Sequence, residues 1–316
     1  MINDKRIKIR QAFRDQYTLS IDAEVNAIES TILSTVEIRY DFQVLNIKED
    51  CVEVRLLVLE SKVVKANNPM VNEVAQVSQV FGRMYNELHL QIEPNGRVLK
   101  VLNSDLILSK WRDTKAEMEK HISGNEELKQ AISLHDELFN NVDKVKVAVQ
   151  ANEFFAMYFG HVYDTDLPMA KKVFGTNIFN TANLEWNLNS ESDPVLPTQG
   201  KEIVTIKTTS LPKLPLTDGF CNAAYQQFKD KIKIDPTQIK MIHTEERTLE
   251  YETGRLRRSS ISKIEEIDPE KLYHKFKFTM LSDSEKKILE NGSNVEEKGI
   301  GGKEGNDEKI YGVRWT

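Results

Sequence analysis

The stretch VEIRYDFQVL (residues 36–45) alternates apolar and polar side chains without a break. One set of alternate positions is apolar and consists of Val36, Ile38, Tyr40, Phe42 and Val44; polar or charged residues take the positions between them. Successive side chains of a β-strand point to opposite faces, so this pattern predicts a strand with one buried and one solvated face. Strands of this kind belong to antiparallel sheets, which cover only one side with core.

After this strand the chain turns at 48–50 and returns through a second alternating run at 52–64. From Val71 the apolar period changes to that of a helix, which ends near Met84. A further strand at 88–92 then meets Pro94-Asn95-Gly96. Asn and Gly tolerate positive φ, so this tripeptide predicts the turn of a hairpin.

A similar order recurs in the second half of the chain. We expect strands at 183–189 and 202–211, and a helix with Asp218 as its N-cap that carries Cys221, Ala224 and Tyr225 inward. A hairpin at 248–264, with its turn at Gly254, and a strand at 271–281 follow. We interpret the two series as pseudo-repeated strand-strand-helix-hairpin halves produced by duplication.

Between the halves we expect a helical connector. Ser104-Asp105 and Asn125 have the residue types that cap two helices. The segment EFFAMYFGHVY (153–163) is rich in aromatic residues and includes Phe154, Phe155 and Tyr158. Two alternatives stay open for it: a buried helix or strand, or an exposed surface that binds another protein.

Composition narrows the class of protein. Of the 316 residues 40% are hydrophobic and 29% are charged, which is typical of a globular chain with a real core. The formal charge of −6 and the lack of a basic stripe disfavour nucleic acid as a partner. The N-terminus has no apolar signal segment, no run of residues is long and apolar enough to span a membrane, and Cys51 and Cys221 match no metal spacing. We therefore expect a cytoplasmic protein with reduced cysteines.

Motifs for catalysis are absent from the sequence. His161, Asp164 and Asp166 lie close together in the chain and form the best candidate for acid–base or metal chemistry, although aspartates in such segments are more often turn formers. Arg257 and Arg258 precede two serines, which suggests either a kinase site, an acidic partner, or only a solvent-facing strand.

The C-terminal residues 291–316 combine glycine and charge and end in IYGVRWT. We expect a flexible tail whose apolar tip, with Tyr311, Val313 and Trp315, either adds a strand to a partner or folds back on its own domain.

These observations predict an α+β fold, mainly antiparallel sheet in two halves with helices packed on one face. The expected parts are a first β-rich half (1–103), a helical connector (104–163), a second β-rich half (164–290) and the tail (291–316). The favoured function is a non-catalytic adaptor or chaperone-like component of a larger bacterial assembly. It would bind a protein partner through Phe154, Phe155, Tyr158, Arg257, Arg258 and the tail tip, without cofactor or metal. The alternatives are a carrier of a small molecule or lipid, with a cavity between sheet and helices, and an enzyme without a recognisable motif.

Overall fold

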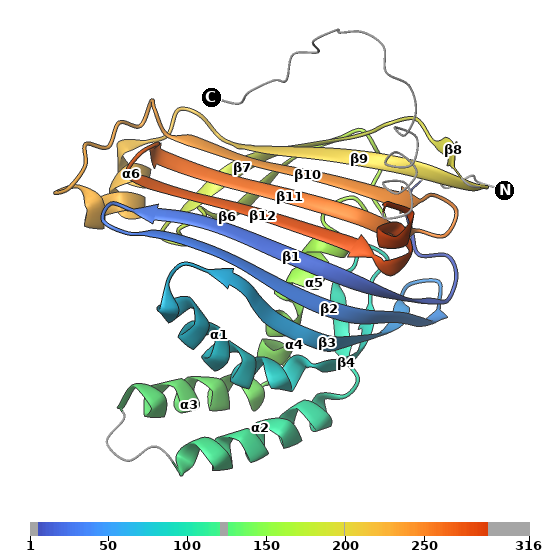
Figure 1. Cartoon of the computed structure of the whole chain (residues 1–316). Coiled ribbons are helices and arrows are strands. Elements are labelled where there is room, and N and C mark those ends of the chain that lie inside the picture. The colour runs from blue at the N-terminus through green and yellow to red at the C-terminus, as the bar shows by residue number, and fades with distance from the viewer. Residues whose placement is uncertain (1–5, 121–125, 199, 290–316) are drawn as a thin grey trace, which may run out of the picture.

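The computed structural model describes residues 6–120, 126–198 and 200–289, and an open twelve-stranded antiparallel sheet dominates it (Figure 1). The strands are β1 (Phe13–Ala27), β2 (Thr31–Ile47), β3 (Val52–Ala66), β4 (Glu87–Ile92), β5 (Val98–Val101), β6 (Met169–Thr176), β7 (Asn183–Ser192), β8 (Leu196–Thr198), β9 (Lys201–Pro212), β10 (Lys240–Glu250), β11 (Arg255–Asp268) and β12 (Leu272–Ser282). The order in space is β5-β4-β3-β2-β1-β12-β11-β10-β9-β7-β6, with β8 paired to β9.

The middle of the sheet joins the beginning and the end of the described chain. β1 pairs with β2 on one side and with β12 on the other, where Leu19 lies opposite Met280. No element was predicted for residues 13–27, which form β1, the strand that connects the two halves of the sheet. The predicted strands are confirmed: those at 36–45, 52–64 and 202–211 lie within β2, β3 and β9, and the one at 271–281 overlaps β12.

The helices are α1 (Pro69–Gly82), α2 (Ser104–Glu119), α3 (Glu126–Phe139), α4 (Val142–Gln150), α5 (Glu153–Tyr158) and α6 (Asp218–Tyr225), with short 3-10 turns η1 (Arg83–Tyr85) and η2 (Gln226–Phe228). Figure 1 shows α1, α2 and α3 beside the β1–β4 end of the sheet and α6 at the opposite end. α5 contacts the sheet directly, because the Phe154 ring lies 6.0 Å from Tyr17 and 4.9 Å from Phe42. We call the side of the sheet that carries Tyr17 and Phe42 the inner face.

The predicted hairpin turn at residues 94–96 is confirmed, and its glycine is needed there. Gly96 has a φ of +87° between β4 and β5. A Cβ atom at this position would lie 2.2 Å from Cγ of Phe159, which follows α5. The hairpin therefore fits closely against the aromatic segment, and it is a structural turn.

Two predicted helix caps are wrong. The side chain that caps α6 is that of Thr217, which accepts a hydrogen bond from the Phe220 amide at 3.1 Å, so the helix begins with Asp218 in its first turn. The cap residue of α2 is Asn103, and its side chain bonds the backbone of His89 and Glu87 in the neighbouring strand. Asn125 lies outside the described residues.

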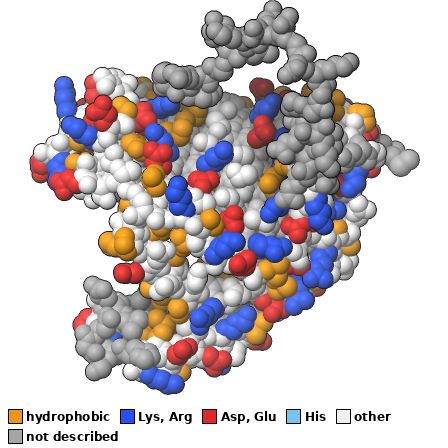
Figure 2. Space-filling model, in the orientation of Figure 1, with side chains coloured by type: hydrophobic (Ala, Val, Ile, Leu, Met, Phe, Trp, Pro, Cys, Tyr) orange, Lys and Arg blue, Asp and Glu red, His pale blue; other side chains and the backbone are white. Residues whose placement is uncertain are grey.

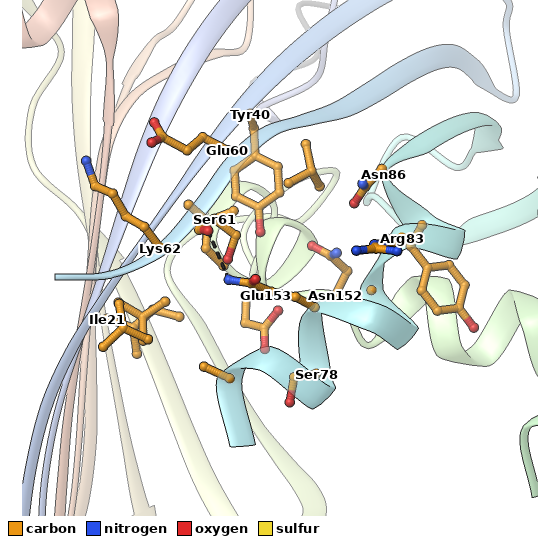
Figure 3. Close-up of a pocket in the computed structure, with 18 of the residues that line it drawn as sticks. Ile21, Tyr40, Glu60, Ser61, Lys62, Ser78, Arg83, Asn86, Asn152 and Glu153 are labelled. Carbon is orange, nitrogen blue, oxygen red and sulfur yellow. Dashed lines mark hydrogen bonds between the residues drawn. The ribbon is translucent and has the colours of Figure 1, made fainter. Parts of the chain in front are cut away.

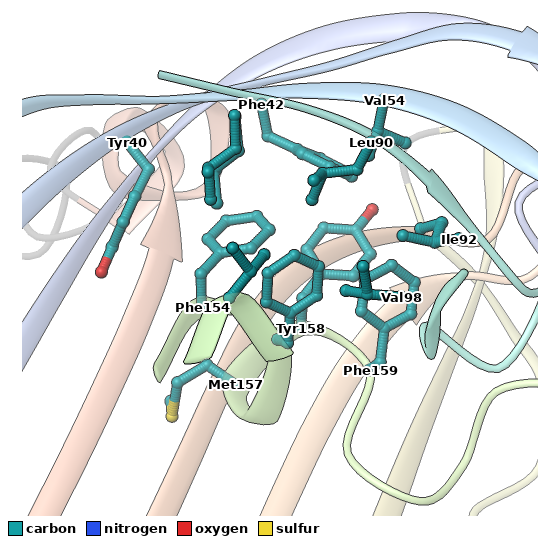
Figure 4. Packing of buried hydrophobic residues seen from close by; sticks show 14 of the residues in the cluster. Tyr40, Phe42, Val54, Leu90, Ile92, Val98, Phe154, Met157, Tyr158 and Phe159 are labelled. Carbon is teal, nitrogen blue, oxygen red and sulfur yellow. The ribbon is translucent and has the colours of Figure 1, made fainter. Parts of the chain in front are cut away.

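Most buried apolar side chains form one large cluster on the inner face. It joins β1–β5 to α2–α5 and reaches β9–β12, and its centre is the aromatic group shown in Figure 4. A smaller cluster surrounds α6 and includes Trp186, Cys221, Tyr225 and Leu272. The outward face of the sheet is polar, with basic and acidic side chains interspersed over the part that Figure 2 shows.

Candidate functional site

A cavity lies between α1, the β1–β3 part of the inner face and the start of α5 (Figure 3). Its volume is about 630 Å³, which is within the range of about 300–1,000 Å³ that small-molecule sites occupy. Residues from β1, β2, β3, α1, η1 and the α5 cap line it. The aromatic cluster and the cavity thus occupy neighbouring areas of the same inner face.

The floor of the cavity is aliphatic because three neighbouring strands present alternate residues to it. Ile21 of β1 lies opposite Val36 of β2, and Val36 lies opposite Val63 of β3. Ile38 and Val58 continue this surface towards Tyr40. All five aliphatic side chains are only partly buried, so the floor retains apolar surface that no protein atom covers.

α1 borders the cavity and contacts the core through Phe81 near its C-terminal end, where the ring stacks on His135 at 3.8 Å. It begins well, since Asn68 accepts a hydrogen bond from the Met70 amide and Pro69 takes the first turn. Yet none of its fourteen residues is buried, and Met70 and Val74 remain 65% and 62% exposed. Val74 nevertheless lines the cavity. A polar contact from α1 to the sheet is the 3.1 Å hydrogen bond that Gln79 donates to the Ser61 carbonyl.

One end of the cavity is polar. Figure 3 shows Arg83, Asn86 and Asn152 on the side of the cavity away from Ile21, with Glu153 between them and α1. Asn152 accepts a hydrogen bond from the Phe154 amide at 2.9 Å and so caps α5. Tyr40 also lines the cavity, and burial, with a smaller contribution from Glu153, raises the pKa of its hydroxyl.

Tyr85 adds an unusual polar group to the lining. Its hydroxyl is buried without a hydrogen-bond partner within the described ranges, and burial raises its pKa to about 12. Tyr85 therefore stays protonated at neutral pH and retains an unused donor.

The structure decides between the two alternatives for the aromatic segment in favour of a buried helix. Phe154, Phe155 and Tyr158 are all 2% exposed or less. The Tyr158 hydroxyl accepts a hydrogen bond from the Leu256 amide at 3.2 Å, which ties α5 to β11. In this arrangement the three side chains are core and offer no surface to a partner.

The basic pair of β11 is split between the two faces of the sheet. Arg257 is 8% exposed and forms a 2.8 Å ion pair with Glu285. Arg258 points to the other face, where it donates to Thr248 Oγ1 at 3.2 Å. Ser259 is 2% exposed, so a kinase has no access to its hydroxyl in this structure.

His161, Asp164 and Asp166 do not assemble into a catalytic or metal site. Asp164 pairs with Arg6 at 3.0 Å and with Lys8 at 3.1 Å, and so fixes the N-terminal segment. His161 Nδ1 lies 3.4 Å from Lys171 Nζ, and its pKa is lowered by desolvation and then by Lys171. Over the ranges that the structure describes, no three His, Cys, Asp or Glu side chains are placed to hold a metal ion.

The remaining predicted site residues, Tyr311, Val313 and Trp315, lie outside the described residues. No helix in the described part of the chain is both long and apolar enough to cross a membrane.

Comparison with known proteins gives little. No protein-family model matches the chain, and no curated protein matches it. Among solved structures it is similar to lipovitellin, in a structure entitled "Lipid-protein interactions in lipovitellin", with a TM-score of 0.41 and 6% identity. The match covers 87% of this chain and 25% of the lipovitellin chain. A likeness at this level carries no argument about function.

Proposed function

We propose that this protein is a non-enzymatic carrier that binds an apolar or amphiphilic small molecule in the cavity between α1 and the β1–β3 part of the inner face. The observation that carries the proposal is the pairing of an aliphatic floor with a helix that has no buried residue. This was the alternative function predicted from the sequence.

The physical argument concerns apolar surface that the protein leaves exposed to water. Val74 of α1, which lines the cavity, is mostly exposed, and the floor residues Ile21, Val36 and Val63 are only partly covered. Full burial of one such side chain contributes about 1.5–3 kcal/mol. A bound chain between α1 and the floor would bury several of them at once.

Two valines of α1 provide a matched test. Val74 and Val77 are 62% and 59% exposed on the same helix, but Val74 lines the cavity and Val77 does not. We expect Val74→Asn to weaken the binding of a long-chain alcohol about tenfold, measured by displacement of a fluorescent apolar probe, and Val77→Asn to leave it unchanged. Equal effects of the two substitutions, or no binding by the unmodified protein, would reject the cavity as the site.

A second candidate function is the protein-binding adaptor, and one observation favours it. β6 forms an edge of the open sheet, and its Phe174 is 80% exposed. An edge strand has unpaired backbone groups that accept an added strand. The residues proposed to dock in this way are Tyr311, Val313 and Trp315 of the tail tip, either on a partner or on this edge.

The adaptor proposal is tested by native pull-down with the full chain and with a version cut after Asn291, followed by identification of the captured proteins. We expect a defined partner with the full chain only. Capture of the same proteins by both versions would show that the tail tip is not the docking strand. The adaptor proposal includes a bacterial source and a cytoplasmic location for this protein.

The duplication is also a proposal. The order β2-β3-α1-β4-β5 in one half corresponds to β7-β9-α6-β10-β11 in the other. The shared order of two strands, a helix and two strands supports a common origin of the halves. We also propose that the chain divides into a first β-rich half, a helical connector, a second β-rich half and a tail.

A further inference from the structure

Charged side chains at the polar end of the cavity carry a further inference, which rests on the proposed carrier function. Arg83 and Glu153 both line the cavity, and Figure 3 shows them on either side of Asn152. Both side chains are exposed to solvent, and within the described part of the chain neither has an ion-pair partner within 4.0 Å. Two opposite charges thus border the same space without neutralising each other.

Some of the neighbouring polar side chains already have a hydrogen-bond or ion-pair partner within the protein, and others have none among the described residues. Asn152 is occupied as the cap of α5. The Asn86 side-chain amide has no hydrogen bond to another described residue, although its backbone carbonyl accepts one from Val58. The other charged lining residues, Glu60 and Lys62, come from β3, and Lys62 is paired with Glu37 at 3.1 Å. Arg83 is therefore the unpaired cation among the described lining residues.

A ligand head that carries both charges would satisfy this end of the cavity. An arginine fork suits a phosphate, which accepts two parallel hydrogen bonds from it, and a carboxylate suits an ammonium group. A purely anionic head would pair with Arg83 but would bring its charge near Glu153. Arg83 and Glu153 are exposed at this end of the cavity, so a purely apolar ligand would leave both charges in water and would gain no ionic contact from them.

We propose that the ligand is a zwitterionic amphiphile whose phosphate binds Arg83 and Asn86, whose ammonium group binds Glu153, and whose chain lies on the aliphatic floor formed by Ile21, Val36 and Ile38. This assigns the direction of the ligand: the head lies at η1 and the α5 cap, and the chain runs under α1 towards β1.

The test uses the full chain and four probes: lysophosphatidylethanolamine, lysophosphatidylglycerol of the same chain length, an alcohol of that chain length, and glycerophosphoethanolamine, which has the head but no chain. Dissociation constants are measured by calorimetry for the unmodified protein, Arg83→Gln and Glu153→Gln. Lys48→Gln with Glu49→Gln is the matched control, since both residues are exposed in the β2–β3 turn.

We expect Arg83→Gln to weaken both phospholipids roughly five- to tenfold and to leave the alcohol unchanged. Glu153→Gln should weaken the ethanolamine lipid by a similar factor without weakening the glycerol lipid. The control substitutions should change nothing, and the chainless head should bind at least tenfold more weakly than the full amphiphile.

The outcomes separate the two proposals. If all three chain-bearing probes bind equally to every variant, the cavity is a carrier site but the zwitterion inference is wrong. Binding of the chainless head as tightly as the lipid would point to a small polar ligand and would also overturn it. If none of the probes binds to the unmodified protein, the carrier function itself fails.

Discussion

Two helices on neighbouring areas of the same sheet show opposite relations to the core. α5 has six residues and buries four of them, among rings that lie 4.9–6.0 Å apart. α1 has fourteen residues and buries none. Isolated helices of this length are marginal in water, so tertiary packing must supply most of their stability. α5 receives that support along its whole length, whereas α1 contacts the core through Phe81 near its C-terminal end, where the ring stacks on His135 at 3.8 Å.

The difference distinguishes the part of the molecule that forms the rigid core from the part that has apolar surface left for a ligand. Removing a packed ring from the α5 area leaves a void that its neighbours cannot fill. Changes in α1 alter mainly surface that already faces solvent or the cavity. A ligand between α1 and the floor would cover apolar surface of α1, such as Val74, that the protein leaves exposed, which is why we place the function there.

The largest contrast is expected between a ring of α5 and a valine of α1. Phe154→Ala should lower the free energy of unfolding by about 3–5 kcal/mol, because Phe154 is fully buried against Tyr40 and Phe42. Val74→Ala should change it by about 0.5 kcal/mol or less. Urea denaturation followed by circular dichroism measures both. Similar losses for the two variants would show that α1 is also part of the core.

The two areas should also differ in their response to an added methyl group. Gly96→Ala places a Cβ against Phe159 at a φ of +87°, so we expect a loss of about 2–4 kcal/mol. Gly82→Ala, at the end of α1, meets no atom within 4 Å and should stabilise the protein by about 0.5–1 kcal/mol through helix propensity. Thermal unfolding of the two variants gives the comparison, and a loss at both glycines would contradict it.

A third region, around α6, also packs aromatic rings but includes two histidine side chains that can take up protons. Desolvation lowers the pKa of His243 and of His274 to about 4, and the two rings stack on Trp186 and Phe179. Both histidines are therefore neutral in the folded protein at pH values where the unfolded chain, with a pKa near 6.5, takes up protons. Stability should fall as the pH decreases from about 6.5 to about 4.

Substitution of the two histidines separates their contribution to the pH dependence of stability from that of other ionisable groups. Burial raises the pKa of Glu265, so its protonation in the folded state has the opposite sign and stabilises the protein as the pH falls. His243→Gln and His274→Gln should each reduce the loss of stability between pH 6.5 and 4.5, measured by urea denaturation at several pH values. An unchanged pH dependence in both variants would show that these rings are protonated in the folded state.

The smallest effect is expected on the exposed side of α1. Val77→Asn should change the free energy of unfolding by about 0.5 kcal/mol or less, since Val77 is 59% exposed and does not line the cavity. A larger loss would indicate that α1 packs more tightly than its exposure suggests. The same variant serves as the control for ligand binding.

The antiparallel sheet was predictable because alternation reports directly which face of a strand is buried. β2 shows this most clearly, and the hairpin at Gly96 followed from turn chemistry. β1 also alternates, through Tyr17, Leu19, Ile21 and Val25, so the signal for the central strand was present in the sequence but was not used. The caps at Thr217 and Asn103 were mistaken because neighbouring residues of similar chemistry compete for the same helix end.

The site was predictable only in outline. A cavity between sheet and helices was among the alternatives, but no local pattern places Glu153 of α5 beside Arg83 and Asn86 of the η1 turn, which lie about 70 positions earlier in the chain. The aromatic run at 153–163 showed that the segment was apolar and did not show whether it was inside or outside. That choice depends on tertiary contacts, such as the approach of Tyr17 and Phe42, which lie more than a hundred positions earlier in the chain.

The pairing of β1 with β12 has a consequence for the order of events during synthesis. The partners Leu19 and Met280 are separated by about 260 positions, and a ribosome adds roughly 5–20 residues per second. β1 must therefore wait on the order of 10–50 s after its synthesis before its second neighbour exists. During that time one edge of a long strand, with Tyr17, Leu19 and Ile21 on one side, has no partner from its own chain. The nascent protein is thus most vulnerable to aggregation, and most accessible to a chaperone, at the strand that ends up in the middle of the finished sheet.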